Sequence, residues 1–131
     1  MKHEPPRMNE GAPHWKAARE GRLDLPYCGR CARYAWPPAG ACRSCGGTVE
    51  WRACSGQGRV AAFSVVRRAV DPALKDDVPY VVAFVELDEG ARLFTNIVDA
   101  SPEALRCGQR VRCRFEPTLD GEAAVVVFAP D

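Results

Sequence analysis

The sequence lacks the features that mark a membrane or a secreted protein. No apolar run approaches the ~20 residues that a transmembrane helix needs. Residues 1 to 7 contain no apolar stretch that resembles a signal peptide, and seven cysteines cannot all pair in disulfides. We therefore expect no membrane span and a location in the reducing cytoplasm.

Clear catalytic patterns are also missing. The two histidines, His3 and His14, lie near the N-terminus and away from the cysteines, so no nucleophile has an evident base. Paired acids such as Asp76 and Asp77 fall in predicted loops, and no glycine-rich segment matches a phosphate-binding loop. We predict no catalytic residue and interpret the chain as a binding or scaffolding subunit that is not an enzyme by itself.

Charge is divided unevenly along the chain. Residues 1–68 hold 12 Lys and Arg against 5 Asp and Glu, a balance of +7, whereas residues 69–131 hold 6 against 12, a balance of −6. Such asymmetry suits an anionic ligand or an acidic partner at the basic end. A merely solvated basic surface is the alternative.

What the sequence does contain is two cysteine pairs, Cys28-x-x-Cys31 and Cys42-x-x-Cys45, separated by ten residues. A C-x-x-C turn supplies two thiolates from one loop, and tetrahedral Zn²⁺ takes four sulfur ligands at roughly 2.3 Å. Two such pairs at this separation predict a zinc site whose four positions are all filled by protein. A closed site of this kind has a structural role.

A redox pair and a disulfide framework are the alternatives for these cysteines. A redox C-x-x-C normally occurs alone at the start of a helix, and a disulfide framework belongs to a secreted protein. Neither context is present here. Of the remaining cysteines, Cys54, Cys107 and Cys113, we interpret Cys113 as a small buried apolar residue, with a catalytic thiol as the alternative.

The first half of the chain predicts a short helix followed by a zinc ribbon. Residues 12 to 21 have proline near their start, alanines inside and Gly21 as a stop, and Trp15 is their only large apolar side chain. Strands are predicted over residues 23–27, 33–36 and 48–53. The glycines of Ser55-Gly-Gln-Gly58 then interrupt the strand alternation and mark the boundary between the ribbon and the second half of the chain.

The second half predicts a β-barrel. Ser101 to Gly108 has an N-cap serine, an early proline and a final glycine, which are typical of a short helix. Five strands with a helix between the third and the fourth are the layout of an OB-fold. The predicted strands cover residues 58–70, 79–87, 92–98, 109–116 and 122–128.

The predicted fold class is therefore mainly β: an N-terminal short helix, a zinc ribbon, and a five-stranded OB-fold barrel with a short helix between strands 3 and 4. The predicted divisions are residues 1–22 for the N-terminal tail and helix, 23–57 for the ribbon and 58–131 for the OB-fold domain. Because the ribbon is too small to bury much apolar surface, we expect zinc to contribute much of its folding free energy.

An OB-fold beside a ribbon also suggests single-stranded nucleic-acid binding, which needs a basic groove and exposed aromatic side chains. The barrel half is acidic, and most of its aromatic residues fall in apolar runs that we assign to the core. Arg110, Arg112 and Arg114 alternate along one strand, where they either track phosphates or form a solvated face. Nucleic-acid binding is the alternative function.

An ordered set of motifs runs from about residue 12 to residue 130. It comprises Trp15, Gly21-Arg-Leu23, Cys28-x-x-Cys31, Pro37-Pro38, Cys42-x-x-Cys45-Gly46, Trp51, Ser55-Gly-Gln-Gly58-Arg-Val60, the run from Pro79 to Leu87, Glu89-Gly90 and Phe115-Glu116. This set resembles the rubredoxin-like zinc-ribbon plus OB-fold proteins first catalogued as a domain of unknown function. The resemblance implies a helix, ribbon and barrel protein.

The resemblance also implies an obligate small subunit of a thiolase-like large subunit, in a hetero-oligomer that performs thiolase, aldolase or acyltransferase chemistry on acyl-CoA. The catalytic cysteine and histidine then belong to the large partner. Because coenzyme A carries phosphates, we place a candidate CoA or anion rim in the basic half, and a partner contact at Trp15. The rim residues are Arg30, Arg33, Arg43, Arg67 and Arg68.

Overall fold

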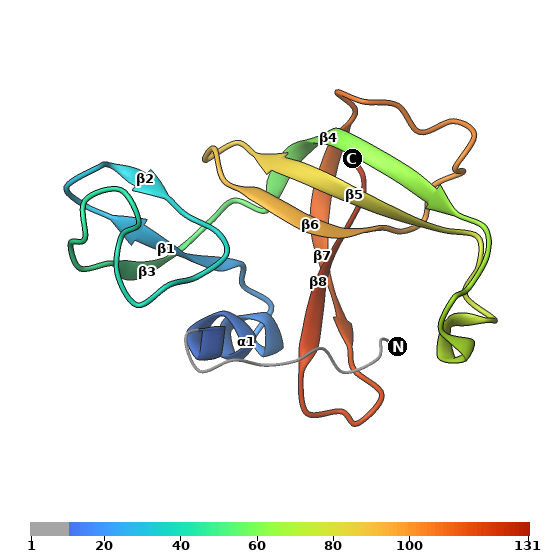
Figure 1. The fold of residues 1–131 in the computed structure, drawn as a ribbon, viewed down its shortest axis with the longest axis horizontal. Helices are drawn as coiled ribbons and strands as arrows, with labels where there is room; N and C mark the ends of the chain where they lie inside the picture. The colour runs from blue at the N-terminus through green and yellow to red at the C-terminus, as the bar shows by residue number, and fades with distance from the viewer. Residues whose placement is uncertain (1–10) are drawn as a thin grey trace.

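The computed structural model describes residues 11–131, and the loose order that we expect for the residues before them lies outside this range. A helix, a three-stranded sheet and a five-stranded barrel follow one another along the chain (Figure 1). The mainly β fold predicted from the sequence is confirmed. The elements are α1 (Ala12–Arg19), β1 (Asp24–Cys28), β2 (Arg33–Tyr34), β3 (Glu50–Ala53), β4 (Gln57–Val66), η2 (Pro72–Leu74), β5 (Tyr80–Leu87), β6 (Arg92–Ile97), β7 (Arg110–Pro117) and β8 (Ala124–Pro130).

The helix α1 packs one face on the protein itself. Pro13 stands in its first turn, where a missing N–H loses no hydrogen bond, and Gly21 follows the helix with a φ of +79°, which glycine adopts without strain. His14, Ala17 and Ala18 are buried, and the helix contacts β1, β7 and β8. α1 therefore lies between the ribbon and the barrel. Across residues 11–131, no helix has both the length and the apolar character to cross a bilayer.

The ribbon is a small antiparallel sheet in the order β2-β1-β3. Tyr27 on the central strand β1 pairs with Tyr34 of β2 on one side and with Glu50 of β3 on the other. Leu25 and Pro26 of the same strand are fully buried. Leu25 belongs to the same cluster of buried residues as the barrel core, so the ribbon and the barrel share apolar contacts.

The barrel closes in the order β4-β5-β6-β8-β7. Neighbouring strands are antiparallel except β6 and β8, which run parallel and register at Ile97 and Phe128. Val81, Ala83 and Val85 of β5 alternate into the barrel and are almost fully buried. Each of the five predicted barrel strands is present, with ends that differ by a few residues from the prediction.

The predicted helix between Ser101 and Gly108 is reduced to a single turn. The N–H groups of Ala104 and Leu105 both donate to Ser101 O, at 3.0 and 3.2 Å, and the turn goes no further. Gly108 takes a φ of +86°, and its N–H donates to Val60 O at 2.7 Å, so β4 holds the end of this segment. The segment is too short to form a stable helix by itself, and the tertiary hydrogen bond to β4 favours a turn instead.

Two phenylalanines of the barrel lie outside its core. Phe84 on β5 and Phe94 on β6 are cross-strand partners, with 45% and 64% of their surfaces exposed. Their neighbours Ala83, Val85 and Leu93 point into the barrel, so strand alternation turns these two rings outward. The assignment of the barrel aromatics to the core is wrong for this pair.

Candidate metal centre

Four cysteine side chains meet at the end of β1. Cys28 closes β1, Cys31 follows in the turn to β2, and Cys42 and Cys45 come from the segment before β3. The Sγ atoms of Cys28 and Cys45 are 3.6 Å apart, and those of Cys31 and Cys42 are 3.8 Å apart. All four sulfur atoms lie within 4.8 Å of one another, so the fold brings the four predicted ligands together.

Backbone hydrogen bonds hold both loops around the sulfur atoms. The N–H of Cys31 donates to Cys28 Sγ at 3.4 Å, and the N–H of Gly47 donates to Cys45 Sγ at 3.4 Å. The second loop is closed by the N–H of Cys42, which donates to Gly47 O at 2.9 Å. Donors aimed at sulfur stabilise the thiolate form, which is the form that binds metals.

The thiols of the cluster differ in acidity. Hydrogen bonds from the backbone N–H groups of Cys45 and Ser44 lower the pKa of Cys42 to about 6. Hydrogen bonds to neighbouring thiols, chiefly Cys45 and then Cys42, raise the pKa of Cys31 to about 12. Thiolates at such distances repel one another, and a cation between the sulfur atoms would offset that repulsion.

The donor set fits a tetrahedral metal ion. Four sulfur atoms at roughly 2.3 Å from a central ion lie about 3.8 Å from one another. The two measured Sγ–Sγ distances, 3.6 and 3.8 Å, agree with that geometry, and all four cysteines are free thiols. The cluster therefore indicates a bound metal ion held by four protein ligands.

The predicted anion rim divides between two ends of the molecule. Arg33 donates to Ser44 Oγ and, with Arg43, lines a cavity of about 370 Å³ that also borders the β5–β6 hairpin. Arg67 instead lies 3.5 Å from Glu103, beyond the end of β4 that points away from the ribbon (Figure 1). All five rim residues are exposed: Arg30, Arg33, Arg43, Arg67 and Arg68.

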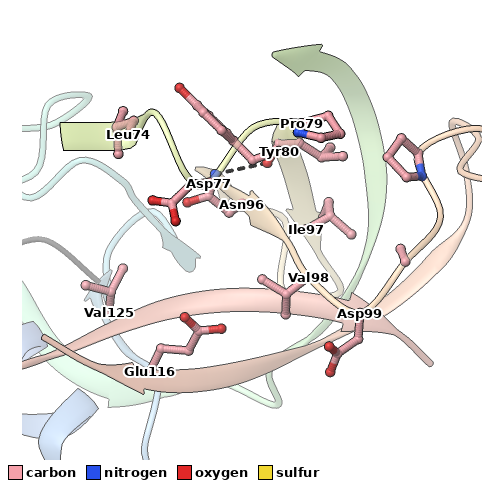
Figure 2. A pocket seen from close by; sticks show the side chains of 13 residues that line it. Leu74, Asp77, Pro79, Tyr80, Asn96, Ile97, Val98, Asp99, Glu116 and Val125 are labelled. Atoms are coloured by element: carbon pink, nitrogen blue, oxygen red, sulfur yellow. Dashed lines mark hydrogen bonds between the residues drawn. The ribbon is translucent and has the colours of Figure 1, made fainter. Parts of the chain in front are cut away.

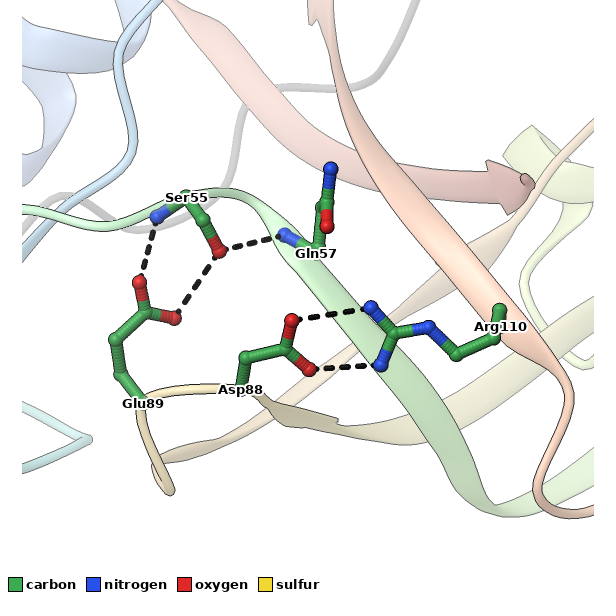
Figure 3. A network of polar contacts seen from close by, with 5 residues as sticks. All are labelled: Ser55, Gln57, Asp88, Glu89 and Arg110. Atoms are coloured by element: carbon green, nitrogen blue, oxygen red, sulfur yellow. Dashed lines mark hydrogen bonds and ion pairs between the residues drawn. The ribbon is translucent and has the colours of Figure 1, made fainter.

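A polar network ties the barrel to the segment that leaves the ribbon, and sequence analysis missed it (Figure 3). Glu89, at the tip of the β5–β6 hairpin, accepts hydrogen bonds from the N–H and the hydroxyl of Ser55 at 2.7 and 3.3 Å. The Ser55 hydroxyl oxygen accepts from the N–H of Gln57 at 3.2 Å, and Asp88 beside it forms a double ion pair with Arg110 at 2.7 and 3.0 Å. In the sequence, this contact corresponds only to a serine and a glutamate in two distant turns. The register of the barrel strands brings the two residues together.

Two of the remaining thiols, Cys54 and Cys113, do not have the acidity of nucleophiles. Burial raises the pKa of Cys54 to about 12 and also raises the pKa of Cys113, while Cys107 is exposed. A thiol with a raised pKa stays neutral near pH 7 and attacks poorly. Cys54 and Cys113 therefore behave as small, half-buried apolar residues.

Two family models match successive parts of the chain. The model of the ChsH2 rubredoxin-like zinc ribbon domain matches residues 15–51, and that of the ChsH2 C-terminal OB-fold domain matches residues 51–116. The chain belongs to the ChsH2/DUF35 family. The family resemblance stated from the sequence motifs is thereby confirmed.

Curated relatives of this ChsH2/DUF35 chain carry two kinds of name. A "DUF35 domain-containing scaffold protein" of Methanothermobacter thermautotrophicus is 36% identical over 104 residues, which are 77% of this chain and 77% of that protein. A "Probable enoyl-CoA hydratase alpha subunit" of Thermomonospora curvata is 34% identical over 128 residues, which are 95% of this chain and 39% of that protein. The chain thus spans about two fifths of the length of the second relative.

Two solved structures share the fold of this chain. A chain of the "Ltp2-ChsH2(DUF35) aldolase" superimposes with a TM-score of 0.86 at 33% identity, covering 97% of this chain and 98% of that chain. A DUF35-family protein of Sulfolobus solfataricus with unknown function superimposes with a TM-score of 0.65 at 12% identity, covering 94% of this chain and 86% of that chain. The second likeness concerns the fold alone.

Proposed function

We propose that this chain is a non-catalytic scaffold subunit of a thiolase-like complex that acts on acyl-CoA. The observation that carries the proposal is the match over nearly the full length of both chains, at 33% identity, to a chain of an aldolase whose name joins Ltp2 and ChsH2. The scaffold proteins among its curated relatives support the same role. The reaction of the large partner is a thiolase, aldolase or acyltransferase reaction.

The metal in this proposal is a structural zinc ion held by Cys28, Cys31, Cys42 and Cys45. The support is the all-sulfur donor set with tetrahedral spacing, because four-cysteine sites of this kind are closed to substrate. Zinc then supplies folding free energy to the ribbon, residues 23–57, and leaves the OB-fold domain, residues 58–131, to present surfaces. The free thiols of the chain also fit a reducing, cytoplasmic location.

Two finer assignments accompany the scaffold role. The basic half contributes to the rim of an acyl-CoA site, and the support is that Arg33 and Arg43 line one cavity beside the metal centre. Trp15 contacts the large subunit, and the support is that its ring is half-buried on an exposed side of α1. The face of α1 that holds His14 is already covered by the protein itself.

The scaffold proposal is tested by purifying the affinity-tagged chain from its native host. We expect a thiolase-like enzyme to co-purify in a fixed ratio, and we expect acyl-CoA turnover to require both chains. Cys54→Ala and Cys113→Ala should leave that turnover unchanged, since neither thiol is proposed to react. Recovery of the chain without such an enzyme would overturn the proposal.

A single-stranded nucleic acid is the second candidate ligand, because Phe84 and Phe94 expose neighbouring rings on barrel strands. The charge of residues 69–131, with 6 basic against 12 acidic side chains, opposes it. A fluorescence titration with a labelled oligonucleotide at low salt separates the two functions. Salt-dependent binding that is lost in Phe84→Ser would support the nucleic-acid function.

A further inference from the structure

Strands β4, β5 and β6 carry an apolar strip on the outside of the barrel. The rings of Phe84 and Phe94 lie 5.1 Å apart between centroids, tilted by 46°. Ala62 of β4 is the register partner of Phe84 and is exposed, and Val82 lies two positions before Phe84 on the same side. We call these four residues, Ala62, Val82, Phe84 and Phe94, the β5–β6 face.

The described elements leave this face uncovered. The helix α1 packs against β1, β7 and β8. Figure 1 shows β5 and β6 in front of β7 and β8, with α1 and the ribbon off to one side. Two adjacent exposed phenylalanines give a folded monomer little stability, whereas paired aromatic rings are frequent anchors at protein interfaces.

The edge of the sheet beside Phe94 is also only partly paired. β6 registers with β5 from Arg92 to Ile97, but within residues 11–131 it registers with β8 at one pair, Ile97 with Phe128. The first half of β6 therefore has a backbone ladder on one side. An extended segment of another protein can add to such an edge while its side chains contact the adjoining face.

A cavity of about 610 Å³ opens near the start of β5 and the end of β6 (Figure 2). Tyr80 and Asn96, which share the outward side of β5 and β6, form part of its wall. Asp77 and Glu116 also line it, and no lysine or arginine is found among its described lining residues. The cavity therefore favours a cationic side chain with an apolar stem.

From these observations we propose that the β5–β6 face docks the thiolase-like large subunit, with a lysine or arginine of that subunit in the cavity. This inference rests on the proposed scaffold function. At the other end of the face Glu86 lies 3.8 Å from Arg92, so the charges there offset each other. The cavity is lined by the carboxylates of Asp77, Glu116 and Asp99, of which Asp99 pairs with Arg114. An apolar segment with a basic residue complements this surface, whereas a nucleic acid or an anionic lipid surface is repelled by these carboxylates.

The test is the dissociation constant between this chain and the purified large subunit, measured by biolayer interferometry. The double variant Phe84→Ser/Phe94→Ser should weaken binding at least tenfold, and Phe94→Tyr, which keeps the ring, should bind within about twofold of the wild type. Asp77→Lys should weaken binding at least threefold and reduce its salt dependence. Leu119→Ser is the matched control, since Leu119 is 50% exposed but lies outside the face. This variant should leave the dissociation constant unchanged.

Zinc content and the thermal unfolding curve verify that each variant is folded. If the double variant unfolds, Phe94→Ser alone is the test, because its 64% exposure leaves the core intact. Unchanged affinity in the folded Phe variants overturns this inference while the scaffold function stands. Absence of binding by the wild-type chain overturns both.

Two further outcomes would also overturn the docking inference. One is self-association of the wild-type chain in analytical ultracentrifugation that the Phe variants abolish, since the face would then bind a second copy. The other is oligonucleotide binding that the same variants abolish.

Discussion

Among single residues, His14 links the helix to the ribbon. The residue is 5% exposed, and its imidazole contacts the rings of Trp15 and Trp36, with centroid distances of 5.2 and 4.6 Å. Its Nδ1 lies 3.3 Å from Asp24 O on β1. Burial lowers the pKa of His14 more than the contact with Asp24 raises it, so the folded state favours the neutral ring.

The first prediction concerns pH. Because the pKa of His14 is lower in the folded state, the unfolded chain binds the proton more tightly, and the stability due to the neutral ring is lost as pH falls through and below about 6.5. The free energy of unfolding should therefore fall less steeply between pH 7.5 and pH 5.5 in His14→Gln than in the wild type. Equal slopes in paired urea titrations would contradict this account. Any pH dependence that the two proteins share cancels in the comparison of their slopes.

Glycine at position 58 is required by a close backbone approach. A Cβ atom there would lie 2.4 Å from Glu86 O and 3.1 Å from Leu87 Cα, both in the backbone of β5. The second prediction is that Gly58→Ala destabilises the fold by about 2 kcal/mol, because β4 must move away from β5. Chemical denaturation measures this change. Gly40→Ala is the control, since a Cβ at Gly40 would meet nothing within 4 Å.

At the scale of elements, the two outer strands of the ribbon are short. β2 has two residues and β3 has four, and the residues of β3 are exposed or half-buried. Strands this short bury little apolar surface, so we expect a metal held by the four cysteines to contribute much of the folding free energy of the ribbon. The shared core helps through Leu25, which the barrel cluster includes.

The third prediction follows from this dependence. Cys42→Ser should reduce the zinc content from one ion per chain to nearly none and lower the melting temperature, because three thiolates no longer close the site. Elemental analysis and differential scanning fluorimetry measure the two effects. Cys107→Ser, which alters an exposed thiol outside the cluster, should keep both values. Full zinc retention by Cys42→Ser would show that the ligand assignment is wrong.

The elements also show which features of the structure could be predicted from the sequence. The cysteine spacing predicted the cluster, because a C-x-x-C turn constrains its own geometry, and strand alternation predicted all five barrel strands. The segment from Ser101 to Gly108 was wrongly predicted as a helix. Its serine, proline and glycine are typical of a helix, but they do not reveal the hydrogen bond from Gly108 to β4. The pairing of Ser55 with Glu89 was beyond prediction for the same reason, since the residues are distant in sequence and meet only through the register of the barrel.

At the scale of the whole molecule, the chain joins a basic metal-binding half to an acidic barrel half. The helix contacts both the ribbon and the barrel, and the hydrogen bonds from Ser55 to Glu89 join the β5–β6 hairpin to the segment that leaves the ribbon. A fixed arrangement suits a scaffold, because surfaces that are already in place lose less entropy on binding. The central claim is accordingly that the chain works bound to a large enzyme subunit.

The most direct test of this claim is size-exclusion chromatography with light scattering on a mixture of this chain and the co-purifying thiolase-like subunit. The account predicts one peak whose mass includes both chains at micromolar concentration, with one zinc per small chain and acyl-CoA turnover in that peak. Trp15→Ala should shift a substantial fraction of the small chain out of the peak without loss of zinc. Separate elution of a 14.3 kDa chain from a large subunit that is fully active alone would contradict the account.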